Sequence, residues 1–129
     1  MAKRLGPGTI LIPRGLDVDA AIRRVKAGRL ITQSRIRERL ALEAGCDQTC
    51  PITTGIFVRI AAEAAVEDEL SGKRRITPFW RVVRDDGSLN EKLPGGAAGQ
   101  ADRLKAEGHH LTRGKKIRVI DFETCLTRQ

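Results

Sequence analysis

The stretch "ITPFWRVVRDDGSLN", residues 76–90, contains the only Trp of the chain and one of its three Phe. Its first half carries the β-branched and aromatic residues that are typical of strands, and Asp86-Gly87 is a strong turn signal. We predict a strand over residues 79–83, then a turn and a weak second strand. Aromatic residues make up only 3% of the chain, so the adjacent Phe79 and Trp80 need an explanation.

Three helices are predicted before this stretch, from apolar residues at helical spacing. Asp17 is read as the N-cap of the first helix, Thr32 as the N-cap of the second, and Pro51 as the first residue of the third. Gly28, Gly45 and the pair at residues 71–72 are read as their ends. The side chains expected to face the core are Val18, Ala21, Ile22, Val25, Ile36, Leu40, Leu42, Ile56, Phe57, Ile60, Ala61 and Ala64.

After residue 90, a fourth helix is predicted to follow the Pro94-Gly95-Gly96 segment and to end at Gly108. A C-terminal β-hairpin is predicted around residues 113–115. The expected fold class is mainly α with small β, a winged helix-turn-helix-like domain plus the hairpin, because a helix pair followed by a β-ribbon is one pattern of DNA-binding folds. We divide the chain into a flexible basic arm, residues 1–16, and one domain, residues 17–129.

The composition favours an anionic partner. The 129-residue chain has a formal charge of +8 and a pI near 10.1, which is the electrostatic footprint of nucleic-acid binders, although a basic surface can also serve solubility alone. No apolar run approaches the roughly 18 residues of a membrane span, and the N-terminus does not read as a signal peptide. Three cysteines are too few and odd in number for a disulfide scaffold. We expect a cytoplasmic, nucleoid-associated monomer with no membrane partner.

Two segments, "TPFWRVVRDDGSL" and "LPGGAAGQADRLKAEGHHL", resemble the DNA-binding, active-site domain of O6-alkylguanine-DNA alkyltransferases and their cysteine-free alkyltransferase-like relatives. That family carries Pro-Cys-His-Arg-Val, an Asp-Gly turn, a Gly-Gly pair and a Leu-x-x-Glu-Gly helix end, and the intervals agree over about 35 residues. The matching positions are Pro78, Phe79, Trp80, Arg81 and Val82; Asp86 and Gly87; Gly95 and Gly96; and Leu104, Glu107 and Gly108. A looser resemblance extends it to residues 17–111, with residues 51–62 as the recognition helix.

The departures from the family's pattern bear on function. The family transfers an alkyl group to a thiolate that a neighbouring His activates and a Glu orients. Here Phe79 stands at the Cys position and Trp80 at the His position, while Glu107 retains the Glu. We therefore expect no alkyl transfer at this site, no catalytic residue, no cofactor and no metal. Phe79, Trp80 and Glu107 could line a base pocket, where aromatic stacking is worth about 1–3 kcal/mol per base; alternatively, the two rings fill the position of a lost active site.

The resemblance implies that the recognition helix enters the minor groove of double-stranded DNA, where Arg and small residues suit close approach. We expect groove contacts from one set of residues, phosphate contacts from a second at the preceding helix start, and general electrostatic affinity from a third. The three sets are Thr53, Thr54 and Arg59; Gln33, Ser34 and Arg35; and Lys73, Arg74 and Arg75 with residues 113–116. Arg81 is placed among the DNA-binding residues, with an ion pair to Glu107 or an Asp as the alternative.

The function expected from the sequence is a non-enzymatic DNA-binding protein that reads alkylated or distorted DNA, including O6-alkylguanine, and signals to a repair protein. The first alternative is a decayed alkyltransferase domain that acts as a general DNA-binding or protein-interaction module. The second is a methyltransferase using Cys50, because a helix N-terminus can lower a thiol pKa. A zinc site made by Cys46, Cys50, His109 and His110 is a further, disfavoured alternative, because adjacent His residues rarely bind one ion together.

Overall fold

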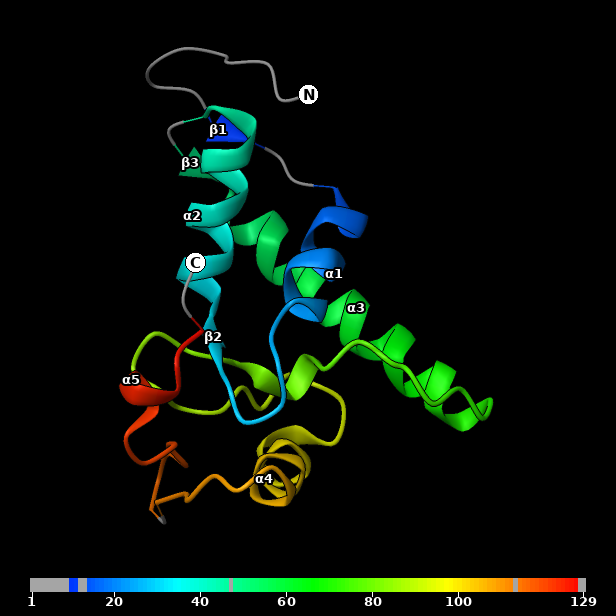
Figure 1. Cartoon of the computed structure of the whole chain (residues 1–129), viewed down its shortest axis with the longest axis vertical. Helices are drawn as coiled ribbons and strands as arrows, with labels where there is room; N and C mark the ends of the chain where they lie inside the picture. Colours follow the sequence, from blue (N-terminus) through cyan, green and yellow to red (C-terminus); the bar gives the residue numbers. More distant parts are fainter. Residues whose placement is uncertain (1–9, 12–13, 47, 113, 128–129) are drawn as a thin grey trace.

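Most of the computed structural model is helical (Figure 1), and it describes residues 10–11, 14–46, 48–112 and 114–127. Helices α1 (Gly15–Arg23), α2 (Gln33–Ala44) and α3 (Pro51–Leu70) pack against one another, as predicted. Their buried side chains, together with residues from the following turn and loops, form the first of two apolar cores. The residues of this core are Val18, Ala21, Ile22, Val25, Ile31, Ile36, Leu40, Val58, Ala61, Ala62, Phe79, Val82 and Leu93.

The predicted helix boundaries agree with the structure except at the first helix. The Thr32 hydroxyl accepts a hydrogen bond from the Arg35 amide at 3.2 Å, and Gly45 ends α2 with φ of 69°, a left-handed conformation that glycine adopts without strain. Pro51 begins α3. The prediction that Asp17 is an N-cap is wrong, because the helix begins earlier and the Asp17 carboxylate instead accepts hydrogen bonds from Arg14 at 3.0 and 3.1 Å.

Four predicted core positions face solvent. The exposed fractions are 82% for Leu42, 47% for Ile56 and 49% for Ile60, and Ala64 is also exposed. The buried side of α3 consists of small or β-branched residues, which are Thr54, Val58, Ala61, Ala62 and Ala65. Apolar residues occur on every side of α3, so their periodicity does not identify the inner face. Small residues allow α1 to lie close against α3, and this packing decides which face is buried.

The described residues include four strands of two residues each, which form two separate two-stranded sheets. β1 (Ile10–Leu11) pairs in parallel with β3 (Gln48–Thr49), and β2 (Ile31–Thr32) pairs in parallel with β4 (Val82–Val83). Part of the predicted arm, residues 10–11 and 14–16, therefore belongs to the folded domain, while residues 1–9 lie outside the described residues. The predicted strand over residues 79–83 is only partly correct, because Phe79–Arg81 form a 3-10 turn, η1, before β4 begins.

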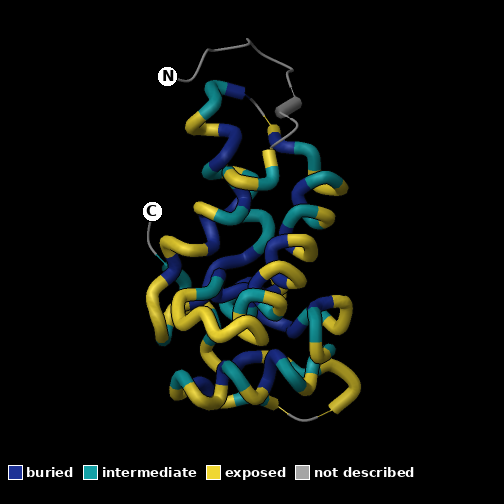
Figure 2. The backbone as a smooth tube through the Cα atoms, turned by 90° about the vertical axis from the view of Figure 1, so that its right-hand side faces the viewer, coloured by how far each residue is buried: buried dark blue, intermediate teal, exposed yellow. Residues whose placement is uncertain are grey.

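The second core lies between α4 (Gly96–Ala106) and the C-terminal segment. An antiparallel bridge joins Leu111 to Val119, as the predicted hairpin requires, although Arg113 at its tip lies outside the described residues. A second antiparallel bridge, between Ser88 and Arg118, was not predicted and joins the hairpin to the segment after the Asp86-Gly87 turn. A short helix that was not predicted, α5 (Phe122–Cys125), covers the turn before Ser88. The turn itself needs glycine: Gly87 has φ of 83°, and a Cβ there would lie 2.4 Å from the Phe122 ring. Buried segments run through the middle of the molecule, with exposed turns at its edges (Figure 2).

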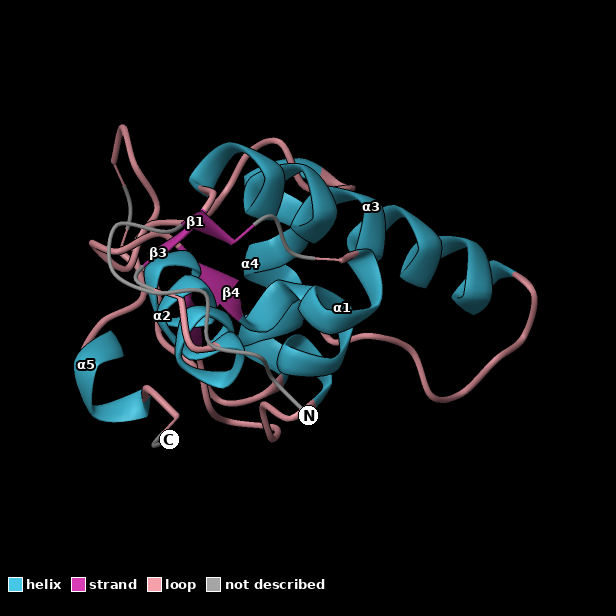
Figure 3. Ribbon diagram, turned by 90° about the horizontal axis from the view of Figure 1, so that it is seen from above, coloured by secondary structure: helices cyan, strands magenta, loops and turns pink. Residues whose placement is uncertain are grey.

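The C-terminal turns of α3 extend beyond the rest of the molecule (Figures 1 and 3). The chain then returns toward η1, so one end of this helix lies in the domain and the other in solvent. Among the described residues, no helix combines the length and apolarity needed to cross a membrane.

Candidate nucleic-acid interface

The start of α2 separates the three residues that were expected to contact phosphate. Gln33 and Ser34 line one hollow, whereas Arg35 lines another on a different side of the helix. The Ser34 amide donates to the Asp85 carboxylate at 3.3 Å, and the Ser34 hydroxyl donates to the same carboxylate. Because Asp85 already uses these donors and adds negative charge, Ser34 is poorly placed to bind a phosphate.

Gln33 belongs to the contact between α2 and α3. A Cβ added to Gly55 would lie 3.1 Å from Gln33 Nε2, so Gly55 leaves room for the side-chain amide of Gln33. The half-buried Gln33 therefore lies at the start of α3, where sequence analysis placed the groove-facing residues.

The three candidates on α3 have different surroundings. Thr54 is fully buried, and its hydroxyl donates to the Cys50 carbonyl oxygen at 2.7 Å, so it cannot reach a groove. Thr53 is half-buried and donates to the Cys50 sulfur at 3.3 Å. Arg59 is exposed, with its guanidinium 3.9 Å from the Glu63 carboxylate. Thr53 and Arg59 remain candidates for DNA contact, and Thr54 is removed from the set.

Exposed isoleucines are the feature of α3 that sequence analysis missed. Ile52, Ile56 and Ile60 are 74%, 47% and 49% exposed, and they follow one another at intervals of one helical turn. Arg59 lies seven residues after Ile52 and therefore on the same side of the helix. We name these four residues the α3 face. The i, i+4 spacing could have identified it, but the same spacing is what predicts a buried stripe.

The basic segment, residues 73–75, follows the C-terminal end of α3, whereas Ile52 lies at the start of this helix. Lys73 pairs with Asp68 at 3.2 Å, whereas Arg74 and Arg75 are exposed, with no ion-pair partner among the described residues. A 20-residue helix is about 30 Å long, so this segment begins at the end of α3 opposite to Ile52. The structure does not join the two into one patch.

Phe79 and Trp80 lie inside the molecule, where they pack against each other and against Arg103. Phe79 is 2% exposed and belongs to the first core, while the half-buried Trp80 packs against both cores. The two rings meet edge to face at 5.4 Å, and the Arg103 guanidinium lies 5.3 Å from the Phe79 ring and 4.8 Å from the Trp80 ring. Arg103 also pairs with Glu69 of α3 at 2.7 Å. We call Phe79, Trp80 and Arg103 the aromatic cluster; in it the rings fill the position expected for a base pocket.

Arg81 has a structural position, as the alternative interpretation held. Its Nε donates to both oxygens of Glu107 at 3.0 and 3.1 Å, and its Nη1 donates to the Val25 carbonyl oxygen at 2.6 Å. The two side chains of this pair are only 14% and 13% exposed. The placement of Arg81 among the DNA-contacting residues is therefore not supported: the 3-10 turn of η1 directs its guanidinium inward.

The ion pair fixes the charge state of Glu107. Burial works to raise the pKa of this carboxyl, but the hydrogen bonds and charge of Arg81 outweigh it, so the pKa lies below its ordinary value. The indole N–H of Trp80 adds to this lowering, although it has no hydrogen-bond partner within ordinary geometric limits. Glu107 is thus an ionised structural partner of Arg81.

Gln100 is a further residue that sequence analysis missed. Its buried side-chain amide donates to the carbonyl oxygens of Trp80 and Val82 at 3.0 and 2.8 Å and accepts from the Asn90 amide at 2.9 Å. The side chain comes from α4, so it fixes η1 and β4 against that helix. Nothing in the local sequence distinguishes such a Gln from a solvent-exposed one.

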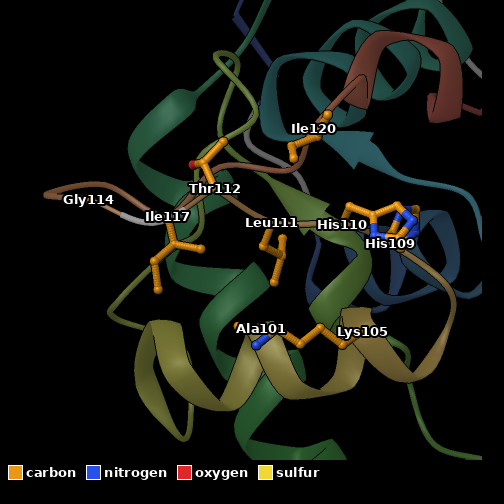
Figure 4. Close-up of a pocket in the computed structure, with 9 residues that line it drawn as sticks. All are labelled: Ala101, Lys105, His109, His110, Leu111, Thr112, Gly114, Ile117 and Ile120. Atoms are coloured by element: carbon orange, nitrogen blue, oxygen red, sulfur yellow. The ribbon is translucent and has the colours of Figure 1, made fainter.

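A separate cavity of about 680 Å³ lies between α4 and the hairpin (Figure 4). Lys105 and His110 line it together with apolar Leu111, Ile117 and Ile120. His109 also lines it; burial lowers the pKa of this imidazole, and its Nε2 has no hydrogen-bond partner among the described residues. The residues of the aromatic cluster and of the α3 face take no part in this cavity.

Cys50 is the thiol nearest to the α3 face in sequence. It precedes α3, and the hydrogen bond from Thr53 lowers the pKa of its thiol. Across the part of the chain that the structure describes, no three His, Cys, Asp or Glu side chains gather where they could hold a metal ion. The four residues of the zinc alternative therefore do not form a site in this arrangement.

No protein-family model and no curated protein matches the chain. Two solved structures share its fold, each with a TM-score of 0.61 and with alignments covering 89% of this chain and 94% of theirs. One is S. pombe Atl1, an alkyltransferase-like protein, in complex with damaged DNA containing O6-carboxymethylguanine, at 16% identity. The other is S. pombe ATL in complex with DNA, at 14% identity. The chain therefore has the fold of the alkyltransferase-like proteins, as the residue resemblance implied.

Proposed function

We propose that this protein binds double-stranded DNA without chemically changing it, and that it selects alkylated or otherwise distorted sites. The observation that carries the proposal is the exposed α3 face on a domain with the fold of two DNA-bound alkyltransferase-like structures. The formal charge of +8 supports a polyanionic partner.

The minor groove is the proposed binding position of α3. Small residues at the start of the helix, Thr53 and Gly55, permit close approach, and the exposed Arg59 suits the negative potential of a narrow groove. The opposite end of the helix carries Glu67, Asp68 and Glu69, so it would point away from the phosphates.

Alkyl transfer at the family position is excluded by the chemistry of the side chains. Phe79 has no nucleophile to accept an alkyl group, and the indole of Trp80 cannot act as the base. A protein of this kind would act by marking its site for other repair proteins.

The test is a fluorescence-anisotropy titration with three duplexes of one sequence: fully matched, carrying a mismatch, and carrying one O6-methylguanine. Each is measured at about 50 mM and about 200 mM salt, since phosphate contacts make affinity fall with salt. Salt-sensitive binding that is tighter for both distorted duplexes supports the proposal. No binding to any duplex would exclude it and favour a protein partner.

The lowered pKa of Cys50 favours one second candidate, transfer of an alkyl group to this thiol. Incubation with DNA that carries a labelled O6-alkylguanine distinguishes the two. Equal label uptake by the wild-type protein and by Cys50→Ser excludes this candidate, whereas label lost only in the variant would establish it.

A further inference from the structure

The cavity between α4 and the hairpin has no part in the proposed contact between α3 and DNA. Its volume of about 680 Å³ falls within the range of about 300–1,000 Å³ that small-molecule sites occupy. Every described residue that lines it belongs to α4 or to the chain that follows, from Ala101 to Ile120, and none belongs to α3. The cavity is therefore a separate place at which a ligand could bind.

Apolar side chains from the hairpin form one wall of this cavity. Leu111 and Ile117 are half-buried and pack against the second core, and they project toward α4 (Figure 4). Ile120, which is 47% exposed, continues the wall. The Ile120 amide donates to the His110 carbonyl oxygen at 2.8 Å, so a backbone hydrogen bond joins the two strands here. The apolar wall therefore has a fixed position in the absence of a ligand.

The wall on the side of α4 carries a cation. Lys105 is exposed, and no carboxylate lies within ion-pair distance of it among the described residues, whereas Arg103 on the same helix pairs with Glu69. The described lining residues include no Asp or Glu. A positive charge in a hollow without carboxylates attracts anions.

The cavity wall also contains an unpaired polar atom. His109 is 8% exposed, and its Nε2 is buried with no hydrogen-bond partner among the described residues. Buried polar atoms are almost always paired, so an exception beside a cavity favours a ligand as the partner. Turning this ring about its Cβ–Cγ bond would bring a nitrogen to the cavity, where a ligand oxygen could bond with it.

We propose that this cavity binds a small amphipathic anion, namely a carboxylate with an aliphatic or aromatic body. The carboxylate pairs with Lys105, and the body packs on Leu111, Ile117 and Ile120. Both parts of the ligand are needed, because inorganic phosphate gains nothing from the apolar wall and an uncharged apolar molecule gains nothing from Lys105. This site is independent of the proposed DNA binding.

The test uses octanoate as the probe and NMR to locate it. Isotope-labelled protein, whose amide signals report residue by residue, is titrated with octanoate, hexanoate, octanol, octylammonium and inorganic phosphate. Lys105→Gln removes the cation, and Ile120→Ala shortens the apolar wall. The matched controls are Lys26→Gln, at an exposed Lys after α1, and Leu16→Ala, at an 82%-exposed side chain of α1. Thermal unfolding confirms that each variant folds.

Octanoate should shift the amide signals of His110, Leu111, Ile117 and Ile120 in the wild-type protein. Hexanoate should bind about fifteenfold more weakly, because each buried CH₂ tightens binding about fourfold. Lys105→Gln should weaken octanoate about fivefold, as expected for a partly exposed ion pair, and leave octanol unchanged. Ile120→Ala should weaken both ligands alike, and the two controls should match the wild type.

Three results would overturn the proposal. Octanol, octylammonium or inorganic phosphate that binds as tightly as octanoate would show that the cavity does not select amphipathic anions. No octanoate shift at the four amides, or shifts confined to α3, would show that the cavity is not the site. Displacement of octanoate from these amides by a DNA duplex would make the hairpin part of the DNA interface. Octanoate binding at these amides in a protein that binds no duplex would support this site and refute the proposed function alone.

Discussion

The aromatic cluster and the α3 face are organised in opposite ways. In the cluster, Phe79 is 2% exposed and Arg103 covers both rings while held by Glu69. On the α3 face, Ile52 is 74% exposed, with no partner for its side chain among the core residues of the described chain. The difference indicates that the position resembling an active site is packed as part of the core, whereas the surface of α3 is open for the DNA contact that we propose.

Phe79→Ala should produce the largest loss of stability. Truncating a buried Phe leaves a cavity and costs about 3–5 kcal/mol, and Phe79 is a buried member of the first core. Urea denaturation measures the loss. A cost below about 1 kcal/mol, as at surface positions, would show that the ring is not part of the core and would remove the contrast with the α3 face.

Arg81→Met should cost about 3 kcal/mol at neutral pH, because it leaves the Glu107 carboxylate largely buried and unpaired. The folded pKa of Glu107 is lowered, so its stabilising contribution is present above its unfolded pKa and is lost as the pH falls through the folded pKa. The difference between wild type and variant should therefore shrink in acid.

Urea denaturation of both proteins over a pH series checks this dependence. Arg84→Met is the matched control, because its pair with Glu91 is 45% and 66% exposed and should be worth about 0–1 kcal/mol. A pH-independent difference for Arg81→Met would mean that lost packing, and not the ion pair, accounts for the cost.

Arg103→Ala should have a smaller effect, about 1 kcal/mol, since its partly exposed pair and its stacking on the rings are each modest. It should also uncover the indole of Trp80. Because Trp80 is the only Trp, a red shift of emission and faster acrylamide quenching report directly on it. Unchanged emission would show that Arg103 does not cover the ring in solution.

Neutralising Arg74 and Arg75 should have the smallest effect on DNA binding. Both follow the end of α3 opposite to Ile52, so their double change to Gln should alter affinity only about twofold, by long-range attraction. Anisotropy at low salt measures it. A loss larger than that of Arg59→Gln would extend the interface along the whole of α3.

Local signals in the sequence predicted most of the fold. Thr32, Gly45 and Pro51 each act on the backbone of their own helix terminus, and the turn at Asp86-Gly87 is equally local. The inner face of α3 was not predictable, because apolar residues surround that helix and only packing against α1 selects Val58 over Ile56. The parallel pairing of β2 with β4 and the helix α5 were also missed. Both depend on contacts between residues that are far apart in the sequence.

The candidate site was predicted less well than the fold. Arg59 is exposed as expected, but Thr54 is buried and Arg81 is paired with Glu107, a residue 26 positions away. No local pattern joins residues so far apart, so the sequence offered this pair only as the alternative to a DNA contact. The exposure of Ile52 was hidden because an apolar i, i+4 pattern ordinarily indicates burial.

The contrast between the aromatic cluster and the α3 face is tested most directly by one titration in which DNA anisotropy and Trp80 emission are both measured. Wild-type protein is added to labelled duplexes, matched or carrying one O6-methylguanine, and the DNA anisotropy and the Trp80 emission are recorded together. The account predicts a rise in anisotropy with nearly unchanged emission for both duplexes, because the aromatic cluster stays closed. Strong quenching of Trp80 only by the O6-methylguanine duplex would contradict it, since an extruded base would then be stacked against the indole.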